Sequence, residues 1–378
     1  MSKRCELSTT GVSRTGFSPR KTAVWAGRGA PVLAVLAAAV CASFYTHSCR
    51  AQTGSSPQAA APQAAQPTAQ VSPGADPGTN WITRNSGTSQ PLLAIFGSSD
   101  GKHVWAVGNA VVESDDGGAT WVVRQIPSTA YSRLTSIFGT GDGKRLWAVG
   151  GAGTILESDD GGATWAMRTS GVENDLNSST GTSDGGHLWA VGGKGTILES
   201  DDGGATWNPR TSGTKEDLQS ILLSSDGKHL WIVGLDTMFV LSDDGGATWT
   251  ATYVISTTSV PNAMFATSDA QHIWILCREG RTLKMDWGGT TWTAHFIDGP
   301  AYPEWIYGTS DGKRLWAVGY NPTSRKGTIL ESDDGGSNWI PRSDSAPDWL
   351  MSIFGSSDGK HLWVVGNSGE ILESDGGK

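Results

Sequence analysis

Short apolar runs alternate with turn-forming residues along most of the chain. Between residues 136 and 167, runs at 136–139, 145–149, 154–157 and 164–167 are separated by Asp142-Gly143 and by the Gly-rich segments 151–153 and 160–162. Such breaks indicate antiparallel strands joined by tight turns. Long stretches with a 3.6-residue apolar period, which would predict helices, do not occur. The pattern therefore predicts a meander of four short strands.

The same pattern returns at a nearly constant interval. The segment Leu-Trp-Ala-Val-Gly, or a close variant, places a Trp at 105, 147, 189, 231, 274, 316 and 363, in steps of 42, 42, 42, 43, 42 and 47 residues. A period of about 40–45 residues with four strands per unit is typical of a propeller blade. The 51 Gly and 18 Trp suit a turn-rich fold packed through indole rings. We predict an all-β chain that forms a seven-bladed β-propeller of four-stranded antiparallel blades.

The seventh unit lacks its fourth strand. Only Asp-Gly-Gly-Lys follows its third run, residues 370–374. The missing strand precedes the first unit, where Trp-Ile-Thr-Arg-Asn-Ser-Gly at 81–87 matches Trp-Ala-Met-Arg-Thr-Ser-Gly at 165–171. We therefore expect the N-terminal strand 81–86 to pair with 370–374, to complete the last blade and to close the ring. This split repeat places the propeller at residues 80–378 and indicates a complete chain.

Most units carry the phrase Ser-Asp-Asp-Gly-Gly-Ala-Thr-Trp, or a variant, between their third and fourth runs. In the second unit, Asp160 and Ser158 can accept hydrogen bonds from turn amides. Gly162 can adopt a positive φ, and Trp165 can cover the apolar side of the turn. We call these segments the box turns and predict a structural role for Ser114, Asp116, Gly118, Trp121, Ser158, Asp160, Gly162, Trp165, Ser200, Asp202, Gly204, Trp207, Ser242, Asp244, Gly246, Trp249, Ser332, Asp334, Gly336 and Trp339.

The box turns resemble the Asp boxes of sialidases and sortilin-type receptors. Paired acids beside glycines also resemble a cation loop, but Ca²⁺ takes about six to eight oxygen ligands and each turn supplies few. In propellers of this kind, the resemblance implies that these turns lie opposite the usual binding face. We therefore predict no metal and no cofactor. The turn at 285–292 departs most, since Met285 and Trp287 replace Ser and Asp, either by drift or to form a contact surface.

The N-terminal segment has the composition of an export signal. The first 51 residues hold seven of the 28 Lys and Arg and one of the 37 Asp and Glu, and an apolar run at 31–40 follows the basic part. Residues 1–51 are either a cleaved signal peptide, which we favour, or an N-terminal membrane anchor. Residues 52–79, rich in Pro, Ala and Gln, are predicted to form a disordered linker. We expect an exported protein, periplasmic or extracellular, with membrane contact only through an uncleaved N-terminus.

Charge limits the possible binding partners, and cysteine content limits the possible disulfides. Beyond residue 51 the chain carries 21 bases and 36 acids, which argues against nucleic acid as a partner. Three of the four Cys precede the repeats, so Cys277 has no partner for a disulfide within the propeller. Packing and ring closure must supply the stability.

The repeats also carry a family resemblance. The string Trp-Ala-Val-Gly-x-x-Gly-Thr-Ile-Leu-x-Ser-x-Asp-Gly-Gly-x-Thr-Trp runs from Trp147 to Trp165 and from Trp189 to Trp207. Over about residues 74–378 the sequence resembles the bacterial propellers related to the photosystem II assembly and stability factor. The resemblance implies a lumenal or periplasmic assembly chaperone that binds a reaction-centre subunit, partly through a cluster of arginines. Repeats of this kind identify a fold better than a function.

Two sets of basic residues recur with the repeats. Their regular placement favours a structural role for the arginines that follow Trp by three residues, in which each covers an indole or bonds a neighbouring blade, over a partner-binding patch: Arg84, Arg124, Arg168, Arg210 and Arg342. We interpret the residues two positions before each repeated Trp as solvent-facing turn residues that do not converge on a metal: His103, Arg145, His187, His229, His272, Arg314 and His361.

Loops that differ between repeats are the expected place of function, because the strands must preserve the packing. These loops are the connectors between blades and, on the same face, the turns between second and third strands, including the insertion 320–326. We call this side the connector face. It is acidic and aromatic, and is either a recognition surface or a solvated rim. Its candidate binding residues are Tyr131, Arg133, Asp175, Asp217, Tyr302, Glu304, Trp305, Asp348 and Trp349.

Two of these candidates depart from the other first strands. Trp305 occupies a position that is Ala or Ser in the other six units, and Glu304 precedes it where the others carry an uncharged residue. Trp305 either plugs the mouth of the central channel, offers a stacking platform to a sugar or a peptide, or fills space beside the longer sixth blade.

Three function classes remain. We prefer a noncatalytic propeller that binds protein partners as a scaffold or assembly factor for an envelope or membrane complex. The alternatives are a sialidase-like glycoside hydrolase and a glycan-binding module. A sialidase needs an arginine triad, a Tyr–Glu nucleophilic pair and a separate acid, and only Tyr302-Pro303-Glu304 places Tyr near Glu in this way. A related endoglucanase would need two propellers around a cleft.

Overall fold

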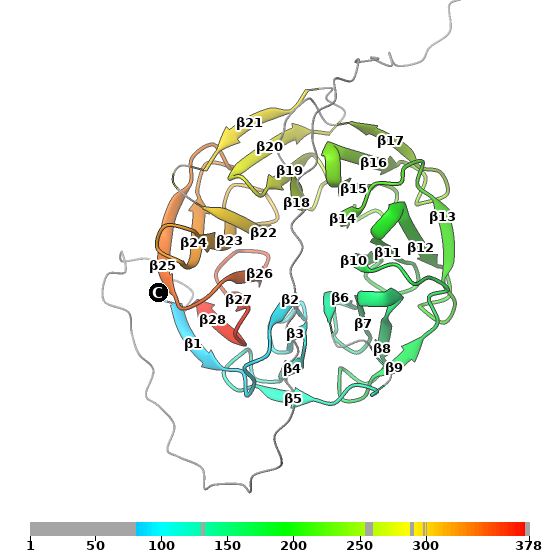
Figure 1. The fold of residues 1–378 in the computed structure, drawn as a ribbon, viewed down its shortest axis with the longest axis horizontal. Helices are drawn as coiled ribbons and strands as arrows, with labels where there is room; N and C mark the ends of the chain where they lie inside the picture. Colours follow the sequence, from blue (N-terminus) through cyan, green and yellow to red (C-terminus); the bar gives the residue numbers. More distant parts are fainter. Residues whose placement is uncertain are drawn as a thin grey trace, which may run out of the picture. The chain divides into compact units, whose positions relative to one another are not determined.

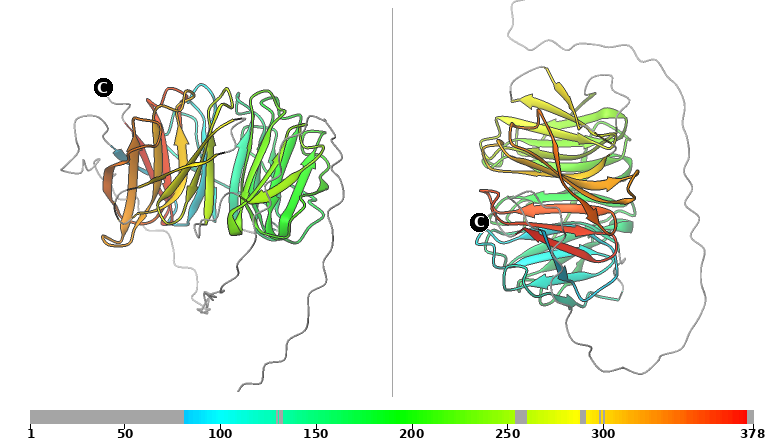
Figure 2. Two further views of the ribbon diagram at one scale, coloured as in Figure 1. Left: turned by 90° about the horizontal axis from the view of Figure 1, so that it is seen from above. Right: turned by 90° about the vertical axis from the view of Figure 1, so that its left-hand side faces the viewer.

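The propeller is built from seven four-stranded antiparallel sheets arranged around one axis. The computed structural model describes residues 81–374 except 129, 131–132, 254–259, 288–290, 298 and 300 and the side chains of 344 and 345. Figure 1 looks down the axis, and Figure 2 shows the strands running roughly along it. The predicted seven-bladed, all-β architecture is confirmed. The predicted signal segment 1–51, the linker 52–79 and Tyr131 lie outside the described residues.

Each blade runs from an inner first strand to an outer fourth strand (Figure 1). The first strands are β2 (Leu92–Gly97), β6 (Leu134–Gly139), β10 (Leu176–Gly181), β14 (Leu218–Leu223), β18 (Pro261–Ala266), β22 (Tyr302–Gly308) and β26 (Leu350–Gly355). The second strands are β3 (Val104–Gly108), β7 (Leu146–Gly150), β11 (Leu188–Gly192), β15 (Leu230–Gly234), β19 (His272–Cys277), β23 (Leu315–Asn321) and β27 (Leu362–Gly366).

In blades one to six, the outer half carries the box turn, regular or altered, between the third and fourth strands. In the seventh blade these two strands come from opposite ends of the described chain. The third strands are β4 (Val111–Ser114), β8 (Ile155–Ser158), β12 (Thr196–Ser200), β16 (Met238–Ser242), β20 (Arg281–Asp286), β24 (Lys326–Ser332) and β28 (Glu370–Ser374). The fourth strands are β5 (Val122–Arg124), β9 (Ala166–Arg168), β13 (Asn208–Thr211), β17 (Thr250–Tyr253), β21 (Thr293–Phe296), β25 (Ile340–Ala346) and β1 (Trp81–Asn85). Single 3-10 turns join second and third strands at η1 (Gly151–Gly153), η2 (Gly193–Gly195) and η3 (Leu235–Thr237).

The ring closes through the two ends of the described chain. Strand β1 pairs antiparallel with β28, with Trp81 opposite Ser374 and Asn85 opposite Glu370. Figure 1 shows the blue β1 beside the red β28 in the seventh blade. The predicted pairing of 81–86 with 370–374 is therefore confirmed, and it covers the open edge that β28 would otherwise expose.

The repeated tryptophans form the packing between blades. All seven are exposed by 1% or less. The indole of Trp105 donates a hydrogen bond of 2.8 Å to the carbonyl of Gly161 in the box turn of the next blade. The same contact joins Trp363 to Gly117 at 3.0 Å, across the closure. Each of these box turns thus covers the tryptophan of the preceding blade.

The box turns use their polar groups internally. Ser158 Oγ accepts the amide of Gly162 at 2.8 Å and donates to Asp160 at 2.8 Å. Asp160 accepts both the amide and the hydroxyl of Thr164, at 2.8 and 2.6 Å. These two bonds, the hydroxyl first, lower the pKa of Asp160. Gly162 has φ of 93°, which favours glycine. The carboxylate is therefore occupied by the turn that it stabilises.

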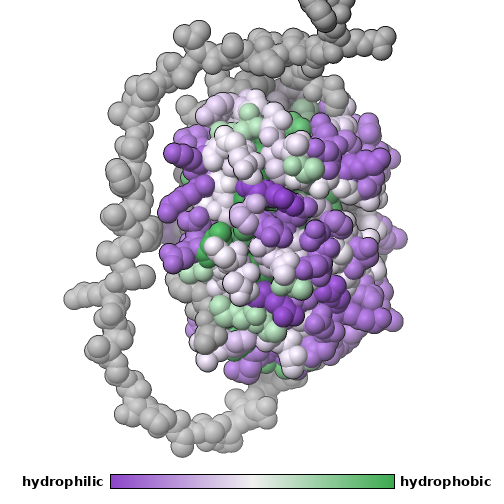
Figure 3. Space-filling view, turned by 90° about the vertical axis from the view of Figure 1, so that its right-hand side faces the viewer, coloured by the Kyte–Doolittle hydropathy of each residue, from purple (hydrophilic) through white to green (hydrophobic). Residues whose placement is uncertain are grey.

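Three further features bear on the candidate site. The outer side in Figure 3 is mostly hydrophilic or neutral, with scattered hydrophobic residues. Across the described ranges of 81–374, no cluster of three or more His, Cys, Asp or Glu is placed to hold a metal ion. No helix within these ranges is long and apolar enough to span a membrane.

Candidate functional site

Three aromatic residues lie close together on the connector face of blades six and seven. Tyr302 lies directly opposite Tyr320 on strands β22 and β23, so both side chains lie on one side of the sheet. Tyr320 stacks on Trp349 with ring centroids 5.0 Å apart and an interplanar angle of 27°. Tyr302 is 46% exposed, while the other two are half-buried. We call Tyr302, Tyr320 and Trp349 the aromatic strip.

The strip brings together two predicted candidates, Tyr302 and Trp349. Tyr320, which lies between them, was not a predicted candidate. Tyr320 belongs to the insertion that lengthens the sixth unit, so no counterpart in another repeat marked it as unusual. The insertion extends β23 and β24 by two residue pairs, Tyr320 opposite Gly327 and Asn321 opposite Lys326. This longer hairpin holds the Tyr320 ring against the connector that carries Trp349.

Asp348 fixes the connector at the edge of the strip. Its carboxylate accepts the amide of Trp349 at 2.7 Å and the hydroxyl of Ser368. Ser368 lies in the turn between β27 and β28, so this contact ties the connector to the adjacent turn of the same blade. Asp348 thereby holds Trp349 in the position in which it stacks on Tyr320.

Glu370 is a buried acid near Asp348. Its side chain is 8% exposed, and neither carboxylate oxygen has a hydrogen-bond partner within the described residues. Burial, and to a smaller extent the charge of Asp348, raises its pKa to about 7. Glu370 was not among the predicted site residues, although the sequence marks it: three other repeats read Gly-Thr-Ile-Leu, whereas residues 369–372 read Gly-Glu-Ile-Leu.

The raised pKa of Glu370 predicts a pH-dependent stability. The pKa in the folded state, about 7, lies above the usual 4.5, so the stabilisation is complete at low pH and is lost as pH rises through 7. Between pH 5 and pH 8, the free energy of unfolding of Glu370→Gln and of the repeat-like Glu370→Thr should rise by about 2–3 kcal/mol relative to that of the native chain. Denaturant unfolding at both pH values measures this gain. Parallel pH profiles for the native chain and the variants would contradict it.

Glu304 and Trp305 join neighbouring blades. Every first strand has a register shift at this position, and in the sixth blade it falls between Pro303 and Trp305 and leaves Glu304 unpaired. The Glu304 carboxylate accepts the side-chain amide of Asn262 in the fifth blade at 2.6 Å, and burial raises its pKa. Trp305 packs against two core clusters, one between blades five and six and one between blades six and seven. These contacts favour the space-filling interpretation of Trp305.

The remaining candidates lie on other blades. Asp175 accepts the amide of Ala152 at 2.8 Å, and Asp217 accepts that of Lys194 at 2.8 Å. Both donors have positive φ, 52° and 56°, in turns of the preceding blade. Arg133 is exposed, and its carbonyl accepts the amide of Gly151. The structure therefore does not bring these three residues to the aromatic strip.

The repeated arginines form ion pairs within their own blades. Each donates through Nε to a buried glutamate of the neighbouring third strand: Arg84 to Glu373 at 2.7 Å, Arg124 to Glu113 at 2.8 Å, Arg168 to Glu157 at 2.5 Å, Arg210 to Glu199 at 2.5 Å and Arg342 to Glu331 at 2.8 Å. Their role is structural, as predicted. The predicted partners, an indole or a neighbouring blade, are wrong, because each arginine pairs with a glutamate of its own blade. The first of these pairs joins the two strands of the ring closure.

The residues before the repeated tryptophans are not simply solvent-facing, which corrects the sequence-based interpretation. His103 stacks on Trp105 at 6.0 Å and bonds Asp115 at 3.0 Å. The guanidinium of Arg145 lies 4.7 Å from the ring centroid of Trp147 and bonds Glu157 at 2.9 Å. A planar side chain thus lies over each of these buried indoles.

Comparison with known proteins identifies the family of this chain. The model of the family described as photosynthesis system II assembly factor YCF48 matches residues 78–167 and 175–300, more than half of the chain. Comparison with curated proteins gives no match. The fold is similar to that of YCF48 bound to D1 peptide, at 21% identity and a TM-score of 0.64, covering 79% of this chain and 96% of that chain.

Two further solved structures are similar. YCF48 from Cyanidioschyzon merolae is 22% identical with a TM-score of 0.62, covering 78% of this chain and 98% of that chain. The GH74 xyloglucanase from Xanthomonas campestris is 14% identical with a TM-score of 0.62, covering 78% of this chain and 53% of the enzyme. At these identities the structural likeness supports the fold alone. On the family match, the chain belongs to the photosynthesis system II assembly factor YCF48 family.

Proposed function

We propose that this chain is an exported, noncatalytic propeller that binds a protein partner and serves as a scaffold or assembly factor for an envelope or membrane complex. Family membership supports the assembly role, and a structure of YCF48 with a D1 peptide supports a protein partner. The observation that carries the proposal is the aromatic strip, where an exposed Tyr302 adjoins the stacked pair Tyr320 and Trp349. Large aromatic side chains beside polar groups are typical anchors of protein interfaces.

The surroundings of the acids near the strip support the noncatalytic proposal. A glycosidase needs two carboxyl groups that reach the substrate, one of them with a raised pKa. Glu370 has the raised pKa, but both of its oxygens are shielded from solvent. The Glu304 carboxylate is occupied by Asn262. The xyloglucanase likeness leaves about half of that enzyme without a counterpart, so it gives the hydrolase alternative little support.

Export is supported by the N-terminal composition, a basic segment followed by the apolar run 31–40. The acidic charge beyond residue 51 supports a protein partner over nucleic acid. Cell fractionation should recover the propeller outside the cytoplasm. Recovery of the chain only in the cytoplasm would contradict the proposed export and envelope role. The binding role has its own test.

Site-specific cross-linking tests the binding role. A photoreactive phenylalanine at position 302 should cross-link a discrete protein of the envelope fraction. The same residue at position 253, a 67% exposed tyrosine on the outer strand β17, is the matched control and should give no such product. Identical products from both positions, or none from position 302, would contradict a partner on the strip. Hydrolysis of sialosides or xyloglucan, or selective glycan binding, would favour the carbohydrate alternatives.

A further inference from the structure

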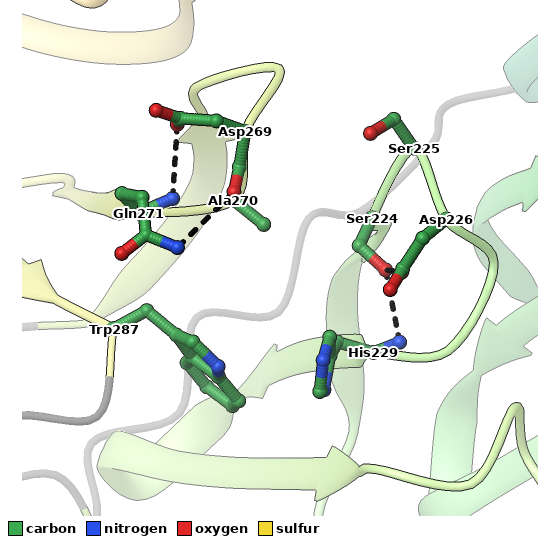
Figure 4. A pocket seen from close by; sticks show the side chains of 8 residues that line it. All are labelled: Ser224, Ser225, Asp226, His229, Asp269, Ala270, Gln271 and Trp287. Atoms are coloured by element: carbon green, nitrogen blue, oxygen red, sulfur yellow. Dashed lines mark hydrogen bonds between the residues drawn. The ribbon is translucent and has the colours of Figure 1, made fainter.

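A small cavity lies between blades four and five on the face of the box turns. It has a volume of about 190 Å³. Figure 4 shows its walls, the turn of Ser224 to Asp226 from blade four and the turn of Asp269 to Gln271 from blade five. Trp287 and His229 point toward one another at its base. Sites for drug-sized ligands occupy about 300–1,000 Å³, so this cavity suits a single side chain.

The cavity is found at the blade whose box turn is altered. In regular blades a box glycine approaches the preceding tryptophan, as Gly162 approaches Trp105 and Gly246 approaches Trp189. In blade five, Trp287 replaces the box aspartate and contacts Trp231 edge to face at 5.0 Å. Trp287 also lies 5.0 Å from the ring of His229. An indole thus forms the base of the cavity in place of an internally bonded carboxylate.

The wall supplied by blade four carries a carboxylate with a free oxygen. Asp226 Oδ1 accepts the Ser224 hydroxyl at 2.6 Å and the Lys228 amide at 3.1 Å. The equivalent aspartates of four other blades also receive a lysine ammonium on Oδ2: Asp100, Asp142, Asp311 and Asp358 at 3.7, 3.1, 3.3 and 3.1 Å. Within the described residues Lys228 makes no such ion pair, which leaves Asp226 Oδ2 available. Its hydrogen bonds, that of Ser224 first, lower the pKa of Asp226, so it is ionised at neutral pH.

The opposite wall of the cavity adds a second carboxylate. Asp269 stands on the opposite wall, with its carboxylate turned toward Gln271, which occupies the lysine position of that blade. The Asp243 carboxylate is hydrogen-bonded to Nδ1 of His229 at 3.0 Å. A planar cation can therefore stack on an indole while it donates hydrogen bonds to a carboxylate, the two contacts that suit a guanidinium.

We propose that this cavity binds an arginine side chain of a protein, with Trp287 as the stacking surface and Asp226 as the hydrogen-bond acceptor. The cavity lies on the side opposite the connector face, so the proposal does not depend on the aromatic strip. It also gives Trp287 a role as a contact surface, the alternative to sequence drift.

Blocked arginine, Nα-acetyl-arginine N-methylamide, is the probe. The protein is labelled with 5-fluorotryptophan, and the Trp287 resonance is assigned from Trp287→Phe. At constant ionic strength we expect blocked arginine to shift this resonance saturably in the millimolar range. Blocked lysine should bind more weakly, since it lacks the planar group, and blocked norleucine should not bind.

Substitution of the carboxylate separates recognition from general stability. Asp226→Asn retains an acceptor for Ser224 and Lys228 but loses the charge, and should weaken binding by about tenfold. Asp142→Asn makes the same change in a turn with the same hydrogen bonds and is expected to leave binding unchanged. The proposal is wrong if blocked norleucine binds as well as blocked arginine, if no saturable shift occurs, or if the two asparagine variants behave alike.

Discussion

Deletion of residues 81–85 should lower the melting temperature of the propeller by about 10 °C or more, because it removes the strand that closes the ring. The deletion leaves the edge of β28 unpaired and withdraws Arg84 from Glu373, a carboxyl group that is only 10% exposed. It also removes Trp81, which packs against the core cluster between blades six and seven. Each loss alone is destabilising, and the three act on one blade.

Single substitutions measure the contributions of individual β1 side chains to this loss of stability. Trp81→Ala should cost about 2–3 kcal/mol, less than for a fully buried tryptophan because Trp81 is half-buried. Thr83→Ala on the same strand is the matched control, since Thr83 is exposed, and should stay within about 0.5 kcal/mol. Thermal and denaturant unfolding measure both.

A rearranged chain provides a rescue for the deletion. Residues 81–87 placed after residue 378, through a linker of box-turn length, would restore the strand order found in the other six blades. We expect this chain to recover most of the lost stability. Unchanged melting after the deletion, or no recovery after the rearrangement, would show that the closure strand does not stabilise the ring as argued.

The repeats made the fold predictable. Blade number, strand order and the closing strand follow from a sequence pattern that recurs several times, so that each copy supports the strand assignment of the others. The internal ion pairs could also have been predicted. Five blades carry both the third-strand glutamate and the arginine of the fourth strand, whereas blades four and five have Leu241 with Thr252 and Lys284 with His295 at these positions. The two residues therefore occur together or not at all.

The candidate site was predictable only in part. Tyr302 and Trp349 were found because they depart from the repeat, but Tyr320 lies in an insertion, and its partner depends on how the hairpin folds back. Asp175 and Asp217 also depart from a strict repeat, yet they bond turn amides of the preceding blade. A departure in sequence marks a residue whose surroundings differ, and contacts decide whether its side chain is available.

The central claim is that the aromatic strip, rather than the exposed residues of the outer strands, binds the protein partner. The most direct test is the dissociation constant of the protein cross-linked from position 302, measured for two double variants. Tyr302→Ala with Trp349→Ala should weaken binding by about tenfold or more, as expected of interface anchors. Tyr253→Ala with Phe296→Ala removes side chains that are 67% and 60% exposed on outer strands and should leave binding unchanged. If both variants fold with similar melting temperatures, equal affinities would contradict the claim.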